Sequence, residues 1–130
     1  MAVFLRIIRE DWASRVFEGG IYYTSLKRRW ERGLKCFFLM KTEAGDSVVG
    51  YGILEDYKTK EEWLKAGGEN FTEHTWKTAL IFGKIVKFQN PIPVKELQLD
   101  QRLKGKYLHG LKADQFLVDK ILNLSEGFSH

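Results

Sequence analysis

Apolar residues occur in short runs along the chain, and the spacing within each run predicts strands and short helices. A first strand is expected over 2–8, which is rich in Val, Phe, Leu and Ile. A helix is expected over 10–17, where apolar residues recur on one helical face. Gly19 and Gly20 would end this helix, and a short strand is expected directly after them.

The clearest predicted pair of elements is a β-hairpin. Two apolar runs over 34–41 and 47–54 flank the turn-forming stretch 43–46. Gly50 and Gly52 lie two positions apart, so they share one face of the second strand. Two positions without side chains on one face indicate a bulge, a bend of the sheet, or close approach of another backbone or a ligand.

The second half of the chain continues the mixture of short elements. A helix is expected over 59–66 and a long strand over 76–88, bent at Gly83. The prolines of 90–93 are expected to end that strand, because proline donates no hydrogen bond to a ladder. An amphipathic helix is expected in the region after Lys112.

This order of elements predicts an α+β fold: a small, mixed, mostly antiparallel β-barrel decorated by short helices. Strands and helices do not alternate regularly enough for a doubly wound parallel sheet. The chain has 130 residues, 44% of them hydrophobic, which fits one core and argues against disorder. We therefore expect a single domain over 1–130.

No apolar run approaches the ~20 residues that span a bilayer. The first residues do not resemble a signal peptide. Cys36 is the one cysteine and has no intramolecular disulfide partner. We expect a cytoplasmic protein that does not bind a membrane.

The net charge of +4 is unevenly distributed along the chain. Segments 1–41 and 76–130 each carry nine Lys and Arg, against four and five Asp and Glu respectively, whereas 42–75 carries three against eight. Basic ends and an acidic middle can produce one basic face after folding. A mixed, solvated surface is the alternative.

Familiar catalytic and metal-binding patterns are missing from the sequence. His74, His109 and His130 are far apart and lack a second ligand at a useful spacing, so we expect no metal site. Cys36 lies in an apolar run, where a thiol behaves as a small hydrophobic group. No serine lies in a nucleophile-elbow context, and no glycine pair matches a phosphate-binding loop. We expect no cofactor.

The most informative segment is 22–32, which combines aromatic rings with cations. RNA binding uses both: cations contact phosphates, and flat rings stack on unpaired bases. The candidate residues in this segment are Tyr23, Lys27, Arg28, Arg29, Trp30 and Arg32. The alternative is that the aromatic residues belong to the core and the cations are simply solvated.

A second basic segment, 102–112, contributes Lys104, Lys106 and His109 as further candidates. The two lysines would contact phosphates, and the imidazole could stack on a base or donate to it. An ordinary connection into the last helix is the alternative. The two segments would form one groove if folding brings them together.

The ordered features resemble the PUA-like superfamily, which includes the PUA, ASCH and EVE domains. The strand at 47–54 resembles the glycine-containing hydrophobic strand of those domains. The segments 77–82 and 88–97 resemble their strand that runs into a proline-containing turn before the last helix. The resemblance covers most of the chain and implies a pseudo-barrel with a pocket beside the first helix. It further implies binding of RNA or a modified base, with Tyr23, Trp30 and Trp76 as the nearest pocket aromatics.

Some ASCH-like members are small amidohydrolases that act on modified nucleosides through a Lys, a Thr and a Glu. The corresponding candidates here are Thr24, Lys27 and Glu55. The chain lacks the Gly-x-Lys-x-x-Thr pattern of that group, because Gly20 is followed by Ile-Tyr-Tyr-Thr. This departure weighs against catalysis.

The sequence therefore favours a binding module for RNA or a modified nucleotide and leaves open whether the chain is an enzyme. The alternatives are the nucleoside hydrolase and a protein-interaction domain. The latter would use the acidic surface around Glu61, Glu62 and Glu69. The sequence does not predict the oligomeric state.

Overall fold

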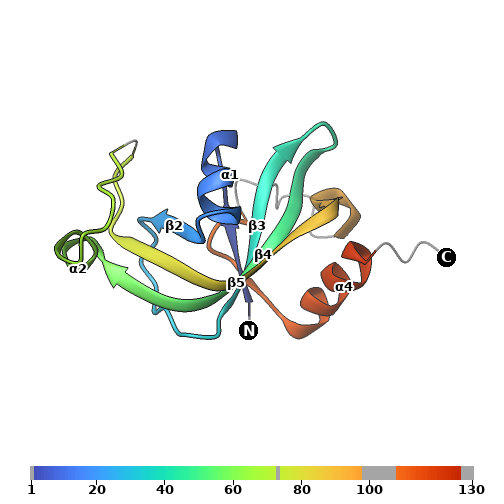
Figure 1. Ribbon diagram of the computed structural model, residues 1–130. Helices are drawn as coiled ribbons and strands as arrows, with labels where there is room; N and C mark the ends of the chain where they lie inside the picture. The colour runs from blue at the N-terminus through green and yellow to red at the C-terminus, as the bar shows by residue number, and fades with distance from the viewer. Residues whose placement is uncertain (1, 73, 98–107, 127–130) are drawn as a thin grey trace.

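A mixed, strongly curved β-sheet forms the frame of the structure, a computed structural model that describes residues 2–72, 74–97 and 108–126. In this part of the chain six strands are arranged in the order β2-β5-β4-β3-β1-β6. They are β1 (Ala2–Arg6), β2 (Ile21–Thr24), β3 (Lys35–Thr42), β4 (Gly45–Thr59), β5 (Thr78–Pro93) and β6 (Lys112–Ala113). β1 pairs with β3 in parallel, and the other pairs are antiparallel. The sheet curls into a half-barrel, so the expected α+β pseudo-barrel is confirmed (Figure 1).

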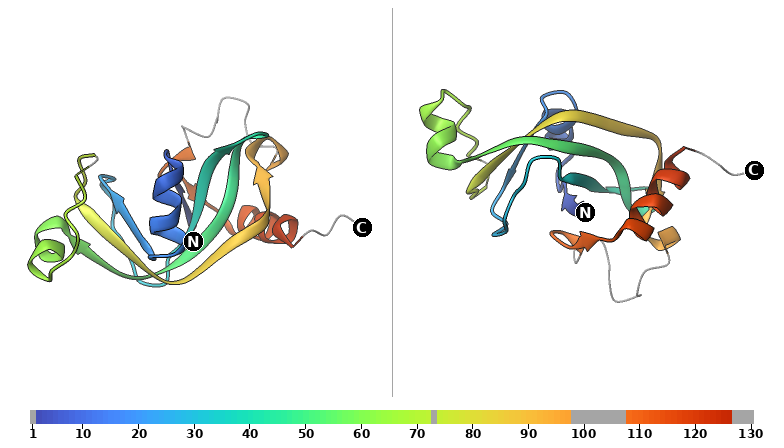
Figure 2. Two further views of the ribbon diagram at one scale, coloured as in Figure 1. Left: turned by 45° about the horizontal axis from the view of Figure 1, so that its top comes forward. Right: turned by 90° about the horizontal axis from the view of Figure 1, so that it is seen from below.

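Short helices cover the open sides of this half-barrel. They are α1 (Glu10–Phe17), α2 (Lys60–Lys65), α4 (Gln115–Ser125) and the 3-10 turn η1 (Val94–Leu97). Thr59 and Glu62 form a capping box at the start of α2, and Asp114 caps α4. Figure 2 shows α1 in the hollow of the curved β4–β5 ribbon, with α2 and α4 at opposite ends of it.

The central strands β1 and β3 are buried on both faces, which explains their nearly continuous apolar sequences. Side chains of a strand alternate between faces. Phe4 and Phe37 therefore pack in the cluster on the α4 side of the sheet. Leu5 and Phe38 pack in the second cluster, which also contains Val16 of α1. The curved sheet thus separates two cores.

Gly50 and Gly52 permit close packing against β4. A Cβ at Gly50 would lie 2.9 Å from the Phe17 ring of α1 and would also collide with the Val86 carbonyl oxygen. A Cβ at Gly52 would lie 2.8 Å from the Phe82 ring. The missing side chains therefore allow α1 and the neighbouring strand to approach β4, one of the alternatives expected from sequence.

One sequence expectation was wrong. The prolines of 90–93 do not end the strand, since β5 continues to Pro93 and pairs there with β4. β2 pairs with β5 only over 78–81, so the outer edge of β5 faces no strand in the described structure from Gly83 onward. Proline is tolerated on such an edge, because its missing N–H leaves no ladder bond unmade.

Replacement of Gly50 by alanine should destabilise the fold, because its methyl group would push α1 away from β4. We expect Gly50→Ala to reduce the free energy of unfolding by about 1–3 kcal/mol, measured by urea denaturation. Gly83→Ala is the matched control, since its methyl group would meet only the flexible Glu55 side chain, at 3.1 Å. Equal losses in the two variants would contradict this account.

Candidate binding cleft

A surface cleft of about 200 Å³ lies between the end of β1, the first turn of α1, and β2. We call it the β2 cleft. Its walls come from five separate segments of the chain, and every side chain except that of Ile8 is aromatic or can form hydrogen bonds. The lining residues are Arg6, Ile8, Trp12, Tyr22, Tyr23, Thr24, Ser25, His74 and His109.

The backbone of Arg6 organises the polar side of the cleft. Its N–H donates to Nδ1 of His109 over 3.0 Å, and its carbonyl accepts from the Tyr22 hydroxyl over 2.6 Å. Both backbone groups are available because β6 pairs only with Ala2 and Val3, which leaves the end of β1 open on that edge. The short β6 thus leaves the N–H and the carbonyl of Arg6 available to fix two side chains of the cleft.

Both of these side chains are neutral near pH 7. Burial lowers the pKa of the His109 imidazole below its usual value, and the positive charge of Arg6 lowers it further. Burial raises the pKa of the Tyr22 hydroxyl, and Cys36 adds to this effect. The guanidinium of Arg6 itself lies 3.6 Å from a carboxylate oxygen of Asp46. The cleft therefore offers neutral hydrogen-bonding groups beside one partly compensated cation.

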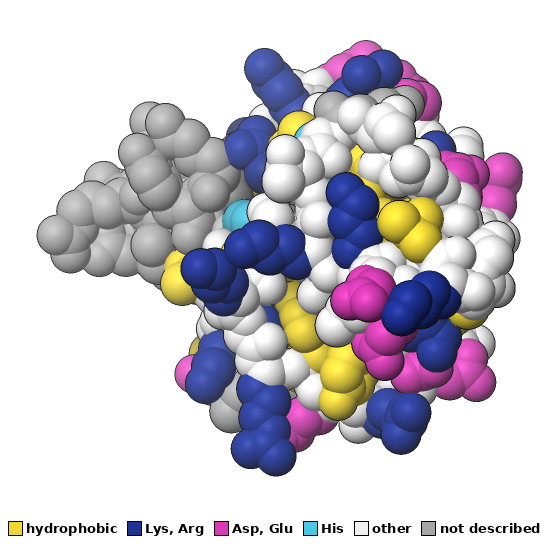
Figure 3. Space-filling model, turned by 90° about the vertical axis from the view of Figure 1, so that its left-hand side faces the viewer, with side chains coloured by type: hydrophobic (Ala, Val, Ile, Leu, Met, Phe, Trp, Pro, Cys, Tyr) yellow, Lys and Arg dark blue, Asp and Glu magenta, His cyan; other side chains and the backbone are white. Residues whose placement is uncertain are grey.

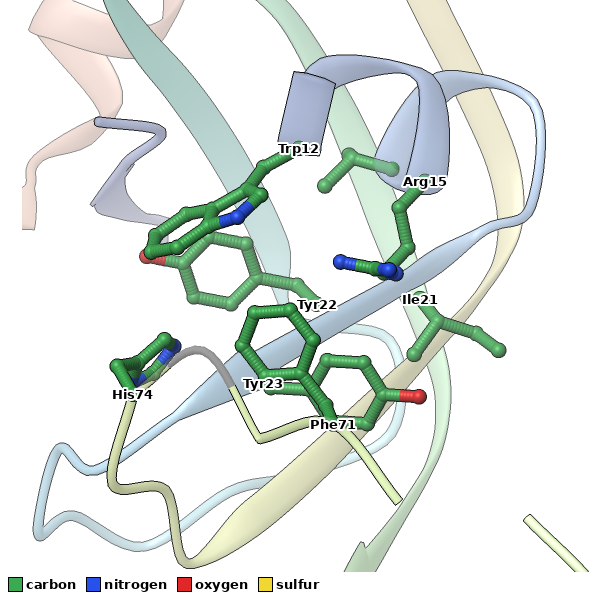
Figure 4. Close-up of a pocket in the computed structure, with 8 residues that line it drawn as sticks. Trp12, Arg15, Ile21, Tyr22, Tyr23, Phe71 and His74 are labelled. Carbon is green, nitrogen blue, oxygen red and sulfur yellow. The ribbon is translucent and has the colours of Figure 1, made fainter. Parts of the chain in front are cut away.

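An aromatic group forms the opposite wall. The rings of Trp12 and His74 lie 5.0 Å apart, and Phe71 makes an edge contact with Trp12 at 5.5 Å. Phe71 also stacks on Tyr23, with ring centroids 4.8 Å apart. Figure 4 shows these rings around an adjoining small cavity, with Arg15 directed at them. The Arg15 guanidinium lies 4.5 Å from the Phe71 centroid and 3.2 Å from a Glu69 oxygen, so a cation already occupies this ring cluster.

The three aromatics proposed from sequence have mainly structural positions. Trp30 is 6% exposed and packs in the core on the α1 side, beneath the Arg28 guanidinium. Trp76 is 1% exposed, and its indole N–H donates to the Phe71 carbonyl over 2.7 Å. Tyr23 lines the cleft, but Phe71 covers its ring. Neither tryptophan lines the β2 cleft, so the structure does not support the stacking role expected for them.

The predicted cations lie on the surface with different partners. Lys27 is exposed and lies two positions after the end of the stretch 22–25, which lines the cleft. Arg29 and Arg32 form ion pairs with Glu31 and Asp56, at 3.6 and 3.2 Å. Arg28 donates from Nε to the carbonyl of Arg29. Lys104 and Lys106 lie outside the described residues.

The structure does bring parts of the two basic segments together. His109, from the second segment, borders the same cleft as Tyr23 and Thr24 from the first. Gly110 of the second segment lies beside Leu26 of the first, since a Cβ at Gly110 would lie 3.1 Å from the Leu26 side chain. The two segments therefore meet at this point, and the lysines expected for the second one lie outside the described residues.

The Lys–Thr–Glu set expected for a hydrolase does not converge. Thr24 pairs with Thr78, which pairs with Thr59 on β4. Glu55 lies four residues from Thr59, roughly 13 Å along the strand, and its side chain packs over Gly83. The Thr24 hydroxyl accepts instead from the N–H of Leu26. Hydrogen-bond reach between Thr24 and Glu55 is excluded.

Sequence reasoning missed Arg6, Ile8, Trp12 and His74 as residues of the cleft. Trp12 carried only a helical-face signal, and His74 was considered only as a metal ligand. No spacing in a single sequence connects positions 6, 12, 74 and 109, because the sheet order brings them together. These four are identified by the structure alone.

No group of three His, Cys, Asp or Glu in the described part of the chain is arranged to hold a metal ion. Among the helices of the same residues, none is long and apolar enough to cross a membrane.

Comparison with solved structures identifies the fold. The crystal structure of ASCH from Zymomonas mobilis has a TM-score of 0.72 and 15% sequence identity, and the match covers 95% of this chain and 94% of that one. An X-ray structure of a protein from Pseudomonas syringae has a TM-score of 0.63 and 15% identity, covering 96% and 99%. A hypothetical protein from Leishmania major has a TM-score of 0.56 and 13% identity, covering 100% and 98%. No family model and no curated protein matches the sequence. The chain therefore has an ASCH-type, PUA-like fold.

Proposed function

We propose that this protein binds RNA, or a nucleotide with a modified base, and holds one unpaired base in the β2 cleft. The observation that carries the proposal is the composition of the cleft: the rings of Trp12 and His74 line it together with Tyr22 and His109, whose polar atoms are fixed by the Arg6 backbone. Unpaired bases are bound by stacking on flat rings and by hydrogen bonds to their edges. The fold shared with ASCH structures supports the same proposal, because the superfamily that the sequence resembles typically binds RNA or modified bases.

Phosphates would be bound by exposed cations at the mouth of the cleft. Lys77 donates its backbone N–H to the Thr24 carbonyl, so its residue lies beside the cleft wall. Lys27 follows the same wall, with Arg28 and Arg29 next to it. Figure 3 views the α2 end of the molecule, where Lys and Arg side chains spread around exposed histidine atoms and the acidic ones gather to one side.

The protein-interaction alternative receives less support from the acidic residues. Glu62 caps α2, Glu61 pairs with Lys65 at 3.0 Å, and Glu69 pairs with Arg15. These carboxylates have partners within the chain, so their charge is partly compensated. Nucleic-acid binding therefore remains the function that we propose.

Removal of two mouth cations should weaken binding through lost phosphate contacts. We expect Lys27→Ala combined with Lys77→Ala to reduce affinity for a single-stranded RNA oligomer about tenfold in low salt. The dependence of log affinity on log salt should also decrease by roughly 0.7 per lysine. Fluorescence anisotropy at several salt concentrations measures both quantities.

The control for this experiment is a double variant of equal charge, Lys84→Ala with Lys95→Ala. Both residues are exposed, and unlike Lys27 and Lys77 neither is close in sequence or joined by a backbone hydrogen bond to the cleft-lining stretch 22–25. The control should bind almost as the unchanged protein does. An equal loss in both double variants would show a general charge effect and would contradict a site at the cleft mouth.

Truncation of Trp12 should remove a stacking surface. A base stacked on an aromatic ring contributes roughly 1–3 kcal/mol, so we expect Trp12→Ala to weaken RNA binding about 5- to 150-fold. Trp12→Phe should weaken it less, because a ring remains. The control is Phe116→Ala on α4, where the ring is 79% exposed and lies outside the cleft. Unchanged affinity in Trp12→Ala, with an unchanged unfolding midpoint, would refute the base-binding cleft.

A further inference from the structure

The hydrogen bond from Arg6 to His109 determines which imidazole nitrogen carries a proton. A backbone N–H can only donate, so Nδ1 of His109 must present its lone pair across the 3.0 Å contact. A neutral imidazole has one N–H, which then lies on Nε2. The depressed pKa of His109, caused by burial and then by the charge of Arg6, keeps the ring neutral near pH 7. In this state the ring can donate from Nε2, and its only acceptor atom is already used.

The turn that carries His109 is held firmly against β1. The N–H of Gly110 donates to the Phe4 carbonyl over 2.7 Å, and the N–H of Phe4 donates to the Leu111 carbonyl over 2.9 Å. Gly110 has a φ of +83°, a left-handed conformation that glycine adopts without strain. Leu108 is buried in the core beside it. The imidazole therefore has a fixed position as well as a fixed tautomer.

The Nε2 donor of His109 is available to a ligand. His109 lines the β2 cleft, and no residue in the described ranges forms a hydrogen bond with its Nε2. Thr24, on the same cleft, accepts the Leu26 N–H and keeps its hydroxyl proton for donation. The cleft thus has one donor of fixed direction, on His109, and one hydroxyl that can rotate to donate, which suits an acceptor-bearing ligand.

The second histidine of the cleft has the opposite arrangement. Nδ1 of His74 lies 2.8 Å from the Thr75 carbonyl oxygen, so this nitrogen donates. In the neutral form, Nε2 of His74 is then an acceptor. The same substitution at the two histidines will therefore have different consequences, which makes His74 a matched control for His109.

We propose that the β2 cleft selects nucleobases that present an exocyclic carbonyl oxygen over those that present an amino group, with His109 as the residue that discriminates. This inference rests on the proposed function. An amino group directed at Nε2 of His109 would place two donors against each other and leave both unpaired. A carbonyl oxygen at that place accepts the proton. Uracil and hypoxanthine fit this requirement, whereas cytosine and adenine have an amino group at the corresponding atom.

Two pairs of RNA hexamers test the inference: uridine against cytidine, and inosine against adenosine. Each pair differs in the exocyclic group and in the proton on the adjacent ring nitrogen, so the loss of preference in a His109 variant is what assigns the preference to His109. We expect the carbonyl member of each pair to bind about tenfold more tightly at pH 7. In His109→Asn the amide oxygen can still accept the Arg6 N–H, but the shorter side chain no longer donates into the cleft. The preference should then fall to within about twofold. His74→Asn should retain the preference even if it weakens binding of every hexamer.

A ligand-free measurement tests the premise separately. Nitrogen-15 NMR of the labelled imidazole should show the proton of His109 on Nε2, with a pKa below the ordinary value of about 6.5. A proton on Nδ1 would overturn the inference. Binding of all four hexamers without a carbonyl preference, or a preference that survives in His109→Asn, would also overturn it. Failure of all four hexamers to bind would instead overturn the proposed function itself.

Discussion

The contact between Phe17 of α1 and the bare backbone of Gly50 sets the position of everything on the concave side of the sheet. Any side chain at Gly50 would collide with the Phe17 ring and with the backbone of β5, so the helix could not settle into the hollow. Because α1 is short, the contact that anchors its last turn also fixes the position of its first turn. The first turn holds Trp12, and the aromatic wall of the β2 cleft therefore depends on a contact on the far side of the same helix.

The polar wall depends on a different constraint, the brevity of β6. A longer strand would pair with the whole outer edge of β1 and use the backbone groups of Arg6 in the ladder. Since β6 pairs with only two residues, the carbonyl of Arg6 is left to bind the Tyr22 hydroxyl and its N–H to bind the His109 ring. The aromatic wall thus depends on a side chain that is missing from β4 at Gly50, and the polar wall depends on the short length of β6.

Most elements could be predicted from the sequence because local periodicity encodes them. α1, β2 and β3 agree closely with their apolar patterns, and β4 continues five residues beyond the predicted strand. The pair Gly50 and Gly52 indicated a bulge, a bend or a close approach, and the structure shows the close approach. The end of β5 could not be predicted, because a strand tolerates a proline only where no neighbouring strand needs its N–H. Whether such a neighbour exists depends on the tertiary structure. The burial of the two tryptophans could not be predicted for the same reason. Trp30 and Trp76 have aromatic rings whose burial is decided by residues distant in sequence, so a local basic environment could not distinguish a core ring from a stacking surface.

The two prolines near the end of β5 have a consequence for how copies of this protein meet in solution. An unpaired strand edge is a template on which a second chain can add its own strand, and such edge-to-edge growth leads to aggregation. Within the described residues β5 has no strand on its outer edge from Gly83 onward, and Pro91 and Pro93 lie near the end of that stretch. A proline supplies no N–H to an added strand, so the residues that misled the prediction of the strand end also make this edge a poorer template for a second chain.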